Sequence, residues 1–193
     1  NGNAYEENGD LVVDTFLSPD GGVLELLHAF AKDRVLEVAP PQLTRLRIDL
    51  EGREVRSREV LASEEEFPRF DIRRTGTAAR YLYTMASDAV VDPYVAHTLV
   101  RRDLIDGTTK RVEAEAGRAL GETVFVARPG GEDEDDGWLL LQGYDAGRDE
   151  NFLEIRDAGT LDLAARAWTG IHFPLGFHGN FAPIAADIRY VAA

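Results

Sequence analysis

Cysteine is absent from this 193-residue sequence, and its absence excludes several kinds of site. Without thiols the chain cannot form a disulfide framework, a thiolate zinc site, an iron–sulfur cluster or a cysteine nucleophile. Lysine is scarce as well, since only Lys32 and Lys110 occur and arginine supplies nearly all the positive charge. The 21 basic residues are outnumbered by 35 acidic ones, which gives a formal net charge of −14. Because binding to phosphates requires clustered basic side chains, we expect no nucleic-acid partner.

Several segments that would define a class of protein are also missing. No apolar run approaches the ~20 residues of a membrane-spanning helix. Neither a glycine-rich phosphate loop nor a Gly-x-Ser-x-Gly elbow occurs. The chain begins Asn-Gly-Asn, its single methionine is Met85, and it shows no signal peptide or charged leader. We therefore expect a piece cut from a longer protein that resides in the cytoplasm.

What the sequence does contain is a series of short apolar runs broken by turn residues, which is typical of an all-β sandwich, barrel or propeller. Residues 43–50 alternate between two faces, as a strand with one wet face does, and Glu51-Gly52 predicts a hairpin into residues 54–61. One helix is expected at residues 22–32, where apolar side chains recur at helical spacing. Further strands are expected at residues 11–16, 80–86, 96–103, 110–115, 123–127, 138–144, 152–157 and 165–169.

Two acidic runs are candidates for cation binding or for buried carboxylates. Residues 130–137 read Gly-Gly-Glu-Asp-Glu-Asp-Asp-Gly, and carboxylate oxygens suit hard cations such as calcium. The spacing is not that of an EF-hand, so a solvated hairpin connection is the alternative. In the run Glu64-Glu65-Glu66, the apolar Phe67-Pro68 follows directly, which indicates that Glu66 is buried.

Four histidines are available as metal ligands: His28, His97, His172 and His178. His28 lies beside the apolar face of the expected helix, and His97 lies among apolar strand residues. We expect both to pack in the interior or at its rim rather than bind metal.

His178 has a different environment, because the proline and glycines of residues 173–181 interrupt any regular strand. Gly179 permits a close approach of the backbone on one side. Between Phe177 and Phe181, the imidazole would be poorly hydrated and neutral, which suits a metal ligand. A lone histidine does not make a site, so a structural role stays open at this point.

Five short segments of the sequence match known motifs in both composition and order. They are Asn3-Ala4-Tyr5-Glu6-Glu7, Glu66-Phe67-Pro68-Arg69-Phe70-Asp71, Gly121-Glu122-Thr123-Val124-Phe125-Val126, Glu134-Asp135-Asp136-Gly137, and a closing stretch that ends in Pro174-Leu175-Gly176-Phe177-His178-Gly179. In this order they resemble the motifs of the carotenoid cleavage oxygenase family, which includes the retinal isomerase of the eye and bacterial lignostilbene dioxygenases. The similarity runs from Asn3 to about Phe181, and Thr123 stands where the family usually has proline.

The resemblance implies an all-β fold made of the C-terminal blades of a seven-bladed β-propeller, with a non-haem Fe(II) on its axis. Residues 1–181 would form roughly the last three blades and residues 182–193 a C-terminal tail. By its position His178 would be the fourth of four iron-binding histidines, and the other three are expected upstream of Asn1. Glu66 and Glu122 fall where the family places carboxylates that orient the ligand histidines.

The activity that the resemblance implies is cleavage of a conjugated carbon–carbon double bond by O₂, which gives two carbonyl products. The substrate would be a small apolar carotenoid, apocarotenoid or stilbenoid, and any peripheral membrane contact would be made by parts outside this chain. Two alternatives remain: a non-catalytic β-propeller binding module, and an iron-dependent isomerase on the same scaffold. Upstream histidines would favour the enzyme over the module, and labelled O₂ would distinguish cleavage from isomerisation.

Overall fold

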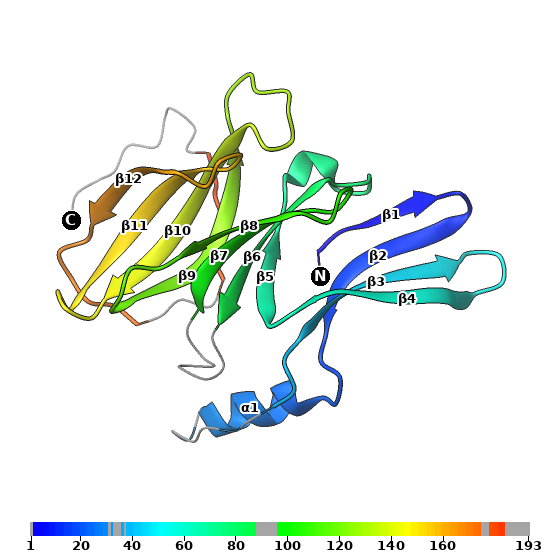
Figure 1. The fold of residues 1–193 in the computed structure, drawn as a ribbon, viewed down its shortest axis with the longest axis horizontal. Coiled ribbons are helices and arrows are strands. Elements are labelled where there is room, and N and C mark those ends of the chain that lie inside the picture. The colour runs from blue at the N-terminus through cyan, green and yellow to red at the C-terminus, as the bar shows by residue number, and fades with distance from the viewer. Residues whose placement is uncertain are drawn as a thin grey trace.

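Strands dominate the computed structural model of this chain, which describes residues 2–30, 32, 36, 38–87, 96–174 and 178–183 (Figure 1). Within these residues the strands form three successive antiparallel groups. The first group is β1 (Ala4–Glu7), β2 (Asp10–Leu17), β3 (Gln42–Asp49) and β4 (Glu54–Ser63); the second is β5 (Glu65–Arg69), β6 (Tyr81–Ser87), β7 (Ala96–Asp103) and β8 (Thr109–Glu113); the third is β9 (Arg118–Ala127), β10 (Gly137–Asp145), β11 (Glu150–Asp157) and β12 (Leu163–Trp168). The predicted all-β class is confirmed.

Each group is a meander in which every strand pairs with its neighbour in sequence. The expected hairpin between β3 and β4 is present, with Asp49 opposite Glu54. The second and third groups are joined by the pair Ala96–Leu120, so their strands run on as one hydrogen-bonded surface. Short connections, such as those between β3 and β4 and between β10 and β11, explain why turn residues recur along the sequence, whereas β2 and β3 are joined by a longer segment that contains helix α1.

The helices are minor elements. Helix α1 (Gly22–Phe30) confirms the helix expected at residues 22–32 and ends two residues earlier. It lies at the edge of the molecule rather than across a sheet face, and Leu24 is 65% exposed (Figure 1). Among the described residues one further helix occurs, the single 3₁₀ turn η1 (Ile72–Arg74), which Asp71 caps by accepting from the Arg73 N–H. No helix in the described part of the chain has the length and apolar character that a membrane crossing needs.

The main apolar core lies between the second and third groups. Strand β10 alternates strictly between buried and partly exposed residues, which places Leu139 and Leu141 in this core. The rings of Tyr83 and Phe125 stack there with centroids 5.8 Å apart. Other members of the cluster are Met85, Leu99, Leu120, Phe152, Ala158 and Leu161. The second and third groups therefore bury apolar side chains of their strands in one shared core.

The acidic loop at residues 130–137 connects β9 to β10, so the expected hairpin connection is confirmed. Its carboxylates reach the second group. Glu134 accepts from the backbone N–H groups of Arg80 and Tyr81, at 2.6 and 2.8 Å, and Asp135 pairs with Arg101. The loop thus links two strand groups through ion pairs and N–H groups. Among the described residues no three histidine or acidic side chains gather as a metal-binding group, here or elsewhere.

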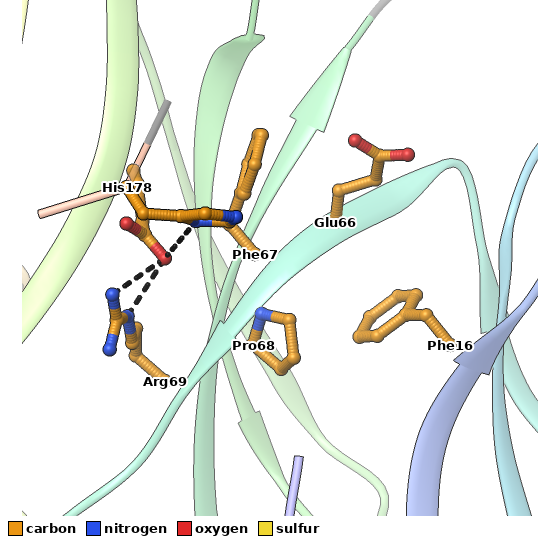
Figure 2. A pocket seen from close by; sticks show the side chains of 7 residues that line it. Phe16, Glu66, Phe67, Pro68, Arg69 and His178 are labelled. Atoms are coloured by element: carbon orange, nitrogen blue, oxygen red, sulfur yellow. Dashed lines mark hydrogen bonds and ion pairs between the residues drawn. The ribbon is translucent and has the colours of Figure 1, made fainter. Parts of the chain in front are cut away.

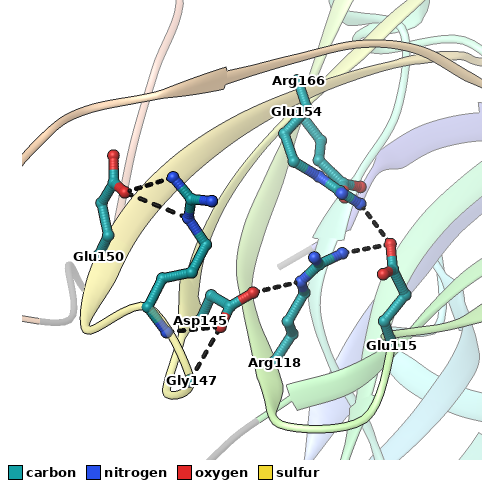
Figure 3. Close-up of polar contacts among 8 residues, drawn as sticks. Glu115, Arg118, Asp145, Gly147, Glu150, Glu154 and Arg166 are labelled. Carbon is teal, nitrogen blue, oxygen red and sulfur yellow. Dashed lines mark hydrogen bonds and ion pairs between the residues drawn. The ribbon is translucent and has the colours of Figure 1, made fainter.

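A second polar cluster ties the strands of the third group together (Figure 3). Arg118 pairs with Asp145 at 2.8 Å, and Arg166 lies 2.6 Å from Glu154 and 2.7 Å from Glu115. The Glu154 side chain is only 2% exposed, so its charge needs these cationic partners. The cluster connects β9, β10, β11 and β12 and is accounted for by this structural role.

Candidate metal centre

His178 begins the last described segment, residues 178–183, which has no regular secondary structure. Residues 175–177, including Phe177, lie outside the described residues, as does the expected tail from residue 184 onward. The imidazole lines a cavity of about 330 Å³ that opens beside β5 (Figure 2). The lining residues are Phe16, Glu66, Phe67, Pro68, Arg69, Glu122 and His178. Strands from all three groups therefore contribute to one cavity.

Glu122 on β9 is the carboxylate that faces His178. Its Oε1 lies 3.5 Å from Nδ1 of the imidazole, and its Oε2 accepts a 2.8 Å hydrogen bond from the Gly179 N–H. The Glu122 side chain is only 8% exposed, whereas the His178 side chain is 64% exposed in this chain. One buried carboxylate thus holds both the ring and the backbone of the histidine segment. The structure brings the predicted pair His178 and Glu122 together.

Arg69 completes this arrangement, and the sequence reasoning did not single it out. Its Nε donates to Glu122 Oε1 at 2.9 Å, and its Nη2 donates to the Gly179 carbonyl oxygen at 2.6 Å. Burial alone would raise the pKa of the Glu122 carboxyl. The hydrogen bonds from Arg69 and from the Gly179 N–H, with the charge of Arg69, outweigh burial and hold that pKa below its ordinary value. Glu122 is therefore a carboxylate at neutral pH.

A backbone irregularity in β5 explains how four consecutive residues can line one cavity. Phe67 has a φ of +55°, which is an outlier for a bulky residue. The pairing of β5 with β6 also shifts register between Glu66 and Arg69. In a regular strand alternate side chains point to opposite faces, whereas this bulge directs residues 66–69 toward the same cavity. The Phe67 ring then meets the His178 ring edge-on, with centroids 5.9 Å apart.

The predicted burial of Glu66 is wrong in this chain, because Glu65 is the buried member of the run. Glu65 is 2% exposed, accepts from Thr84 and pairs with Arg102. Glu66 points to the opposite face and is exposed, although the surrounding protein desolvates its carboxyl enough to raise its pKa. In Figure 2 its carboxylate lies apart from His178, beyond Phe67. A ligand-orienting role for Glu66 stays a prediction.

His97 and His172 have partners away from His178. His97 Nδ1 lies 3.3 Å from the Arg118 carbonyl oxygen, as expected for a packed strand residue. His172 Nδ1 lies 2.9 Å from Asp149 and its ring packs on Tyr144, while His28 is exposed on α1. Metal binding through His178 would need further donors from outside the described residues.

A second cavity, of about 270 Å³, shares Glu122 and His178 with the first. Its walls come mainly from the third group, and five of its lining residues are apolar: Val124, Leu140, Phe152, Leu153 and Phe173. The candidate centre therefore has a charged side at Arg69 and an apolar side over β9, β10 and β11. A Cβ added at Gly179 would lie 3.8 Å from Val124, which is an ordinary van der Waals distance, so this position has room for a side chain. The close backbone approach expected at Gly179 is not what this position requires.

Comparison with known proteins matches residues 1–183 to the family model of the retinal pigment epithelial membrane protein. The chain belongs to this family, which also contains the carotenoid cleavage oxygenases. It is 33% identical over 183 residues to the apocarotenoid-15,15'-oxygenase of Synechocystis sp., covering 93% of this chain and 37% of that protein. It is also 33% identical over 123 residues to a carotenoid cleavage oxygenase of Mycobacterium tuberculosis, covering 62% of this chain and 25% of that protein.

Solved structures agree with the family assignment. The cobalt-substituted Synechocystis oxygenase superimposes with a TM-score of 0.82 at 28% identity, covering 95% of this chain and 39% of that one. A chimera of this oxygenase with the retinal protein gives a TM-score of 0.79 at 26% identity. These structures are seven-bladed β-propellers, so the predicted propeller fold is confirmed. The chain spans well under half the length of the relatives that it matches.

Proposed function

We propose that this chain is part of an Fe(II)-dependent dioxygenase that cleaves a conjugated double bond of a carotenoid or apocarotenoid. The reaction adds both atoms of O₂ across one C=C bond, which breaks and leaves two C=O groups. One observation carries the proposal: the imidazole of His178 is backed by the buried carboxylate of Glu122, in a chain whose relatives are named carotenoid and apocarotenoid oxygenases.

The donor chemistry of the site fits a metal ion. A histidine that ligates metal typically presents its other ring N–H to a carboxylate, which fixes the tautomer and raises the donor strength of the ring. Glu122 stands at Nδ1 of His178, so Nε2 is the nitrogen that would hold the metal. That the Synechocystis relative has a cobalt-substituted form supports a metal ion in this fold. When bound, iron supplies the activation of O₂.

This chain's own residues would orient the ligand and shape the cavity around it. Glu122 Oε1, 3.5 Å from Nδ1, would favour the ring tautomer that carries its proton at Nδ1 and presents Nε2 to the metal. Phe16, Phe67 and Pro68 provide apolar surface on one side of the centre, and the second cavity provides more on the other. An elongated apolar polyene suits such walls, since apolar surface is buried favourably against apolar surface. Glu66 would orient a further ligand supplied from outside this chain.

The test is His178→Ala in the full-length protein, with iron per chain and products measured under ¹⁸O₂. Removal of one ligand should abolish double-bond cleavage and lower the iron content, while the exposed position of the side chain keeps folding intact. Carbonyl products of the unaltered protein should carry ¹⁸O. Normal turnover and iron content in the variant would refute the assignment of His178. Conversion without ¹⁸O incorporation would indicate the isomerase instead.

A further inference from the structure

We infer that Arg69 is the positioning residue that fixes His178, by holding Glu122 and the backbone of Gly179 in one ion-paired unit. This inference rests on the proposed role of His178 as a metal ligand. The unit formed by Arg69, Glu122 and the Gly179 peptide is called the Arg69 clamp below. In this role Arg69 acts through the two groups that hold the histidine, Glu122 and the Gly179 backbone.

The contacts of the clamp join three distant parts of the chain. Arg69 lies 53 residues from Glu122 and 110 residues from Gly179, and Glu122 lies 57 residues from Gly179. The guanidinium donates at 2.9 Å to Glu122 Oε1 and at 2.6 Å to the Gly179 carbonyl, while Glu122 Oε2 accepts the Gly179 N–H at 2.8 Å. The three groups therefore close a ring of hydrogen bonds that includes the N–H and the carbonyl oxygen of Gly179, the residue next to His178.

The histidine depends on such contacts because its own segment has no regular structure. Residues 178–183 form no strand, and the imidazole is 64% exposed, so neither a ladder nor a packed core fixes the ring. The clamp attaches this segment to β5 and to β9, which are rigid strands of two different groups. A metal ligand held on rigid elements keeps the geometry that a mobile loop would lose.

The chemistry of arginine matters here. Its planar fork presents Nε and Nη2 in a fixed relation, so one side chain can serve a carboxylate and a carbonyl at the same time. A lysine ammonium would keep the positive charge beside Glu122 without that fixed pair of directions. The clamp is also shielded, since the side chains of Arg69 and Glu122 are 27% and 8% exposed. Screening by water is therefore weaker than for a surface pair.

The experiment compares Arg69→Met, Arg69→Lys and a control, Arg128→Met, in the full-length protein. Arg128 pairs with Asp136 at 2.7 Å and Asp157 at 3.2 Å, at 40% exposure, and so reports the loss of an ion-paired arginine elsewhere on the third group. Cobalt(II) is titrated into the metal-free protein, and its visible absorption bands are recorded with the dissociation constant. The bands report the ligand geometry, which a loss of fold stability alone does not alter in a folded variant.

Arg69→Met should weaken cobalt binding roughly 10–100-fold and change the bands, as loss of an outer partner of a ligand does. Arg69→Lys should recover part of the affinity, and Arg128→Met should keep unaltered affinity and bands. Unaltered affinity and bands in Arg69→Met would overturn the inference. If that variant does not fold, Arg69→Lys decides, and identity with the parent protein in both measurements overturns it. If the parent protein binds no cobalt, or His178→Ala binds it equally well, the proposed function fails instead.

Discussion

The two junctions between neighbouring strand groups are built from different chemistry. Between the second and third groups lies the apolar cluster around Tyr83, Phe125 and Leu139, with the acidic loop at its border. The junction between the first and second groups includes side-chain hydrogen bonds, in which the Asn3 amide donates to the carbonyl oxygens of Arg74 and Thr77. The same strand pattern therefore produces one junction held by buried area and another with directional hydrogen bonds.

This difference bears on the candidate centre, which lies where the groups meet. Phe16 comes from the first group, Arg69 from the second and Glu122 from the third, and all line one cavity. Phe67 of β5 packs against the apolar cluster, to which Leu120 and Phe125 of β9 belong, so this junction brings Arg69 close to Glu122. The polar junction fixes the position of Asn3 against the second group. The resemblance places the segment that begins at Asn3 just after a further ligand histidine. Breaking each junction separately tests this division.

The largest effect is expected from the apolar junction. Leu139→Ala in the full-length protein removes a side chain that is 0% exposed and leaves a cavity, so it should cost about 2–5 kcal/mol of unfolding free energy. Denaturant titration measures this loss. Leu153 on β11 is 38% exposed, so Leu153→Ala is the control and should cost much less. Equal losses in the two variants would contradict the placement of the core.

Much of this fold is readable from the sequence, because alternation and turn chemistry act locally. β3, β4 and β10 follow from period-two patterns and turn residues, and these elements occur close to the predicted bounds. β1 and β5 were missed. β1 is short and polar, and β5 contains a proline and a left-handed Phe67, which hide the strand pattern.

The candidate site was only partly predictable. His178 and Glu122 emerge from the resemblance, and their contact needs the tertiary fold, since 57 residues separate Glu122 from Gly179. Arg69 carries no local signal of its role: its partners lie on another strand and on an irregular segment. The simple inference from Phe67-Pro68 that Glu66 is buried fails likewise, because Glu65 occupies the buried face of β5 and Glu66 the opposite face. Long-range contacts and backbone irregularities are the part that the pattern alone does not contain.

The next largest effect is expected from the polar junction. Asn3→Ala removes hydrogen bonds to Arg74 and Thr77 and the acceptor for the Gly76 N–H, at a buried position. The loss should be about 2 kcal/mol, because buried backbone groups are left without partners. Amide exchange should quicken in β1 and β2 and stay unaltered in β10. Asn3→Asp keeps the acceptor but places a carboxylate oxygen against the two carbonyl oxygens at this buried position, so it should cost at least as much as Asn3→Ala. Uniform quickening across all groups would contradict a separate polar junction.

A smaller effect is expected at the border of the apolar junction. Glu134→Gln keeps one oxygen acceptor for the N–H groups of Arg80 and Tyr81 but loses the charge that faces Arg74 at 3.5 Å. The expected loss is about 1 kcal/mol, since charged hydrogen bonds exceed neutral ones by roughly that amount. Denaturant titration of the full-length protein measures it. The exposed Glu132, changed to Gln, is the matched control in the same loop. A loss no greater than that control would show that the loop does not hold the groups together.

The smallest effect is expected in the second group, at the turn that follows β7, and it depends on pH. Burial alone would raise the pKa of Asp103, but the N–H of Ile105, the Arg80 guanidinium and the N–H of Asp106 hold it below its ordinary 3.8. A carboxyl with a depressed folded-state pKa stabilises the fold above the unfolded-state value and loses this contribution as the pH falls through the folded-state value. Asp103→Asn should therefore lower the Tm at neutral pH, and its difference from the parent protein should shrink below pH 3.8. Thermal unfolding of both full-length proteins across this range measures it, with the exposed Asp162→Asn as control. A Tm difference that is constant with pH would mean that the Asp103 side chain stabilises the fold independently of its ionisation.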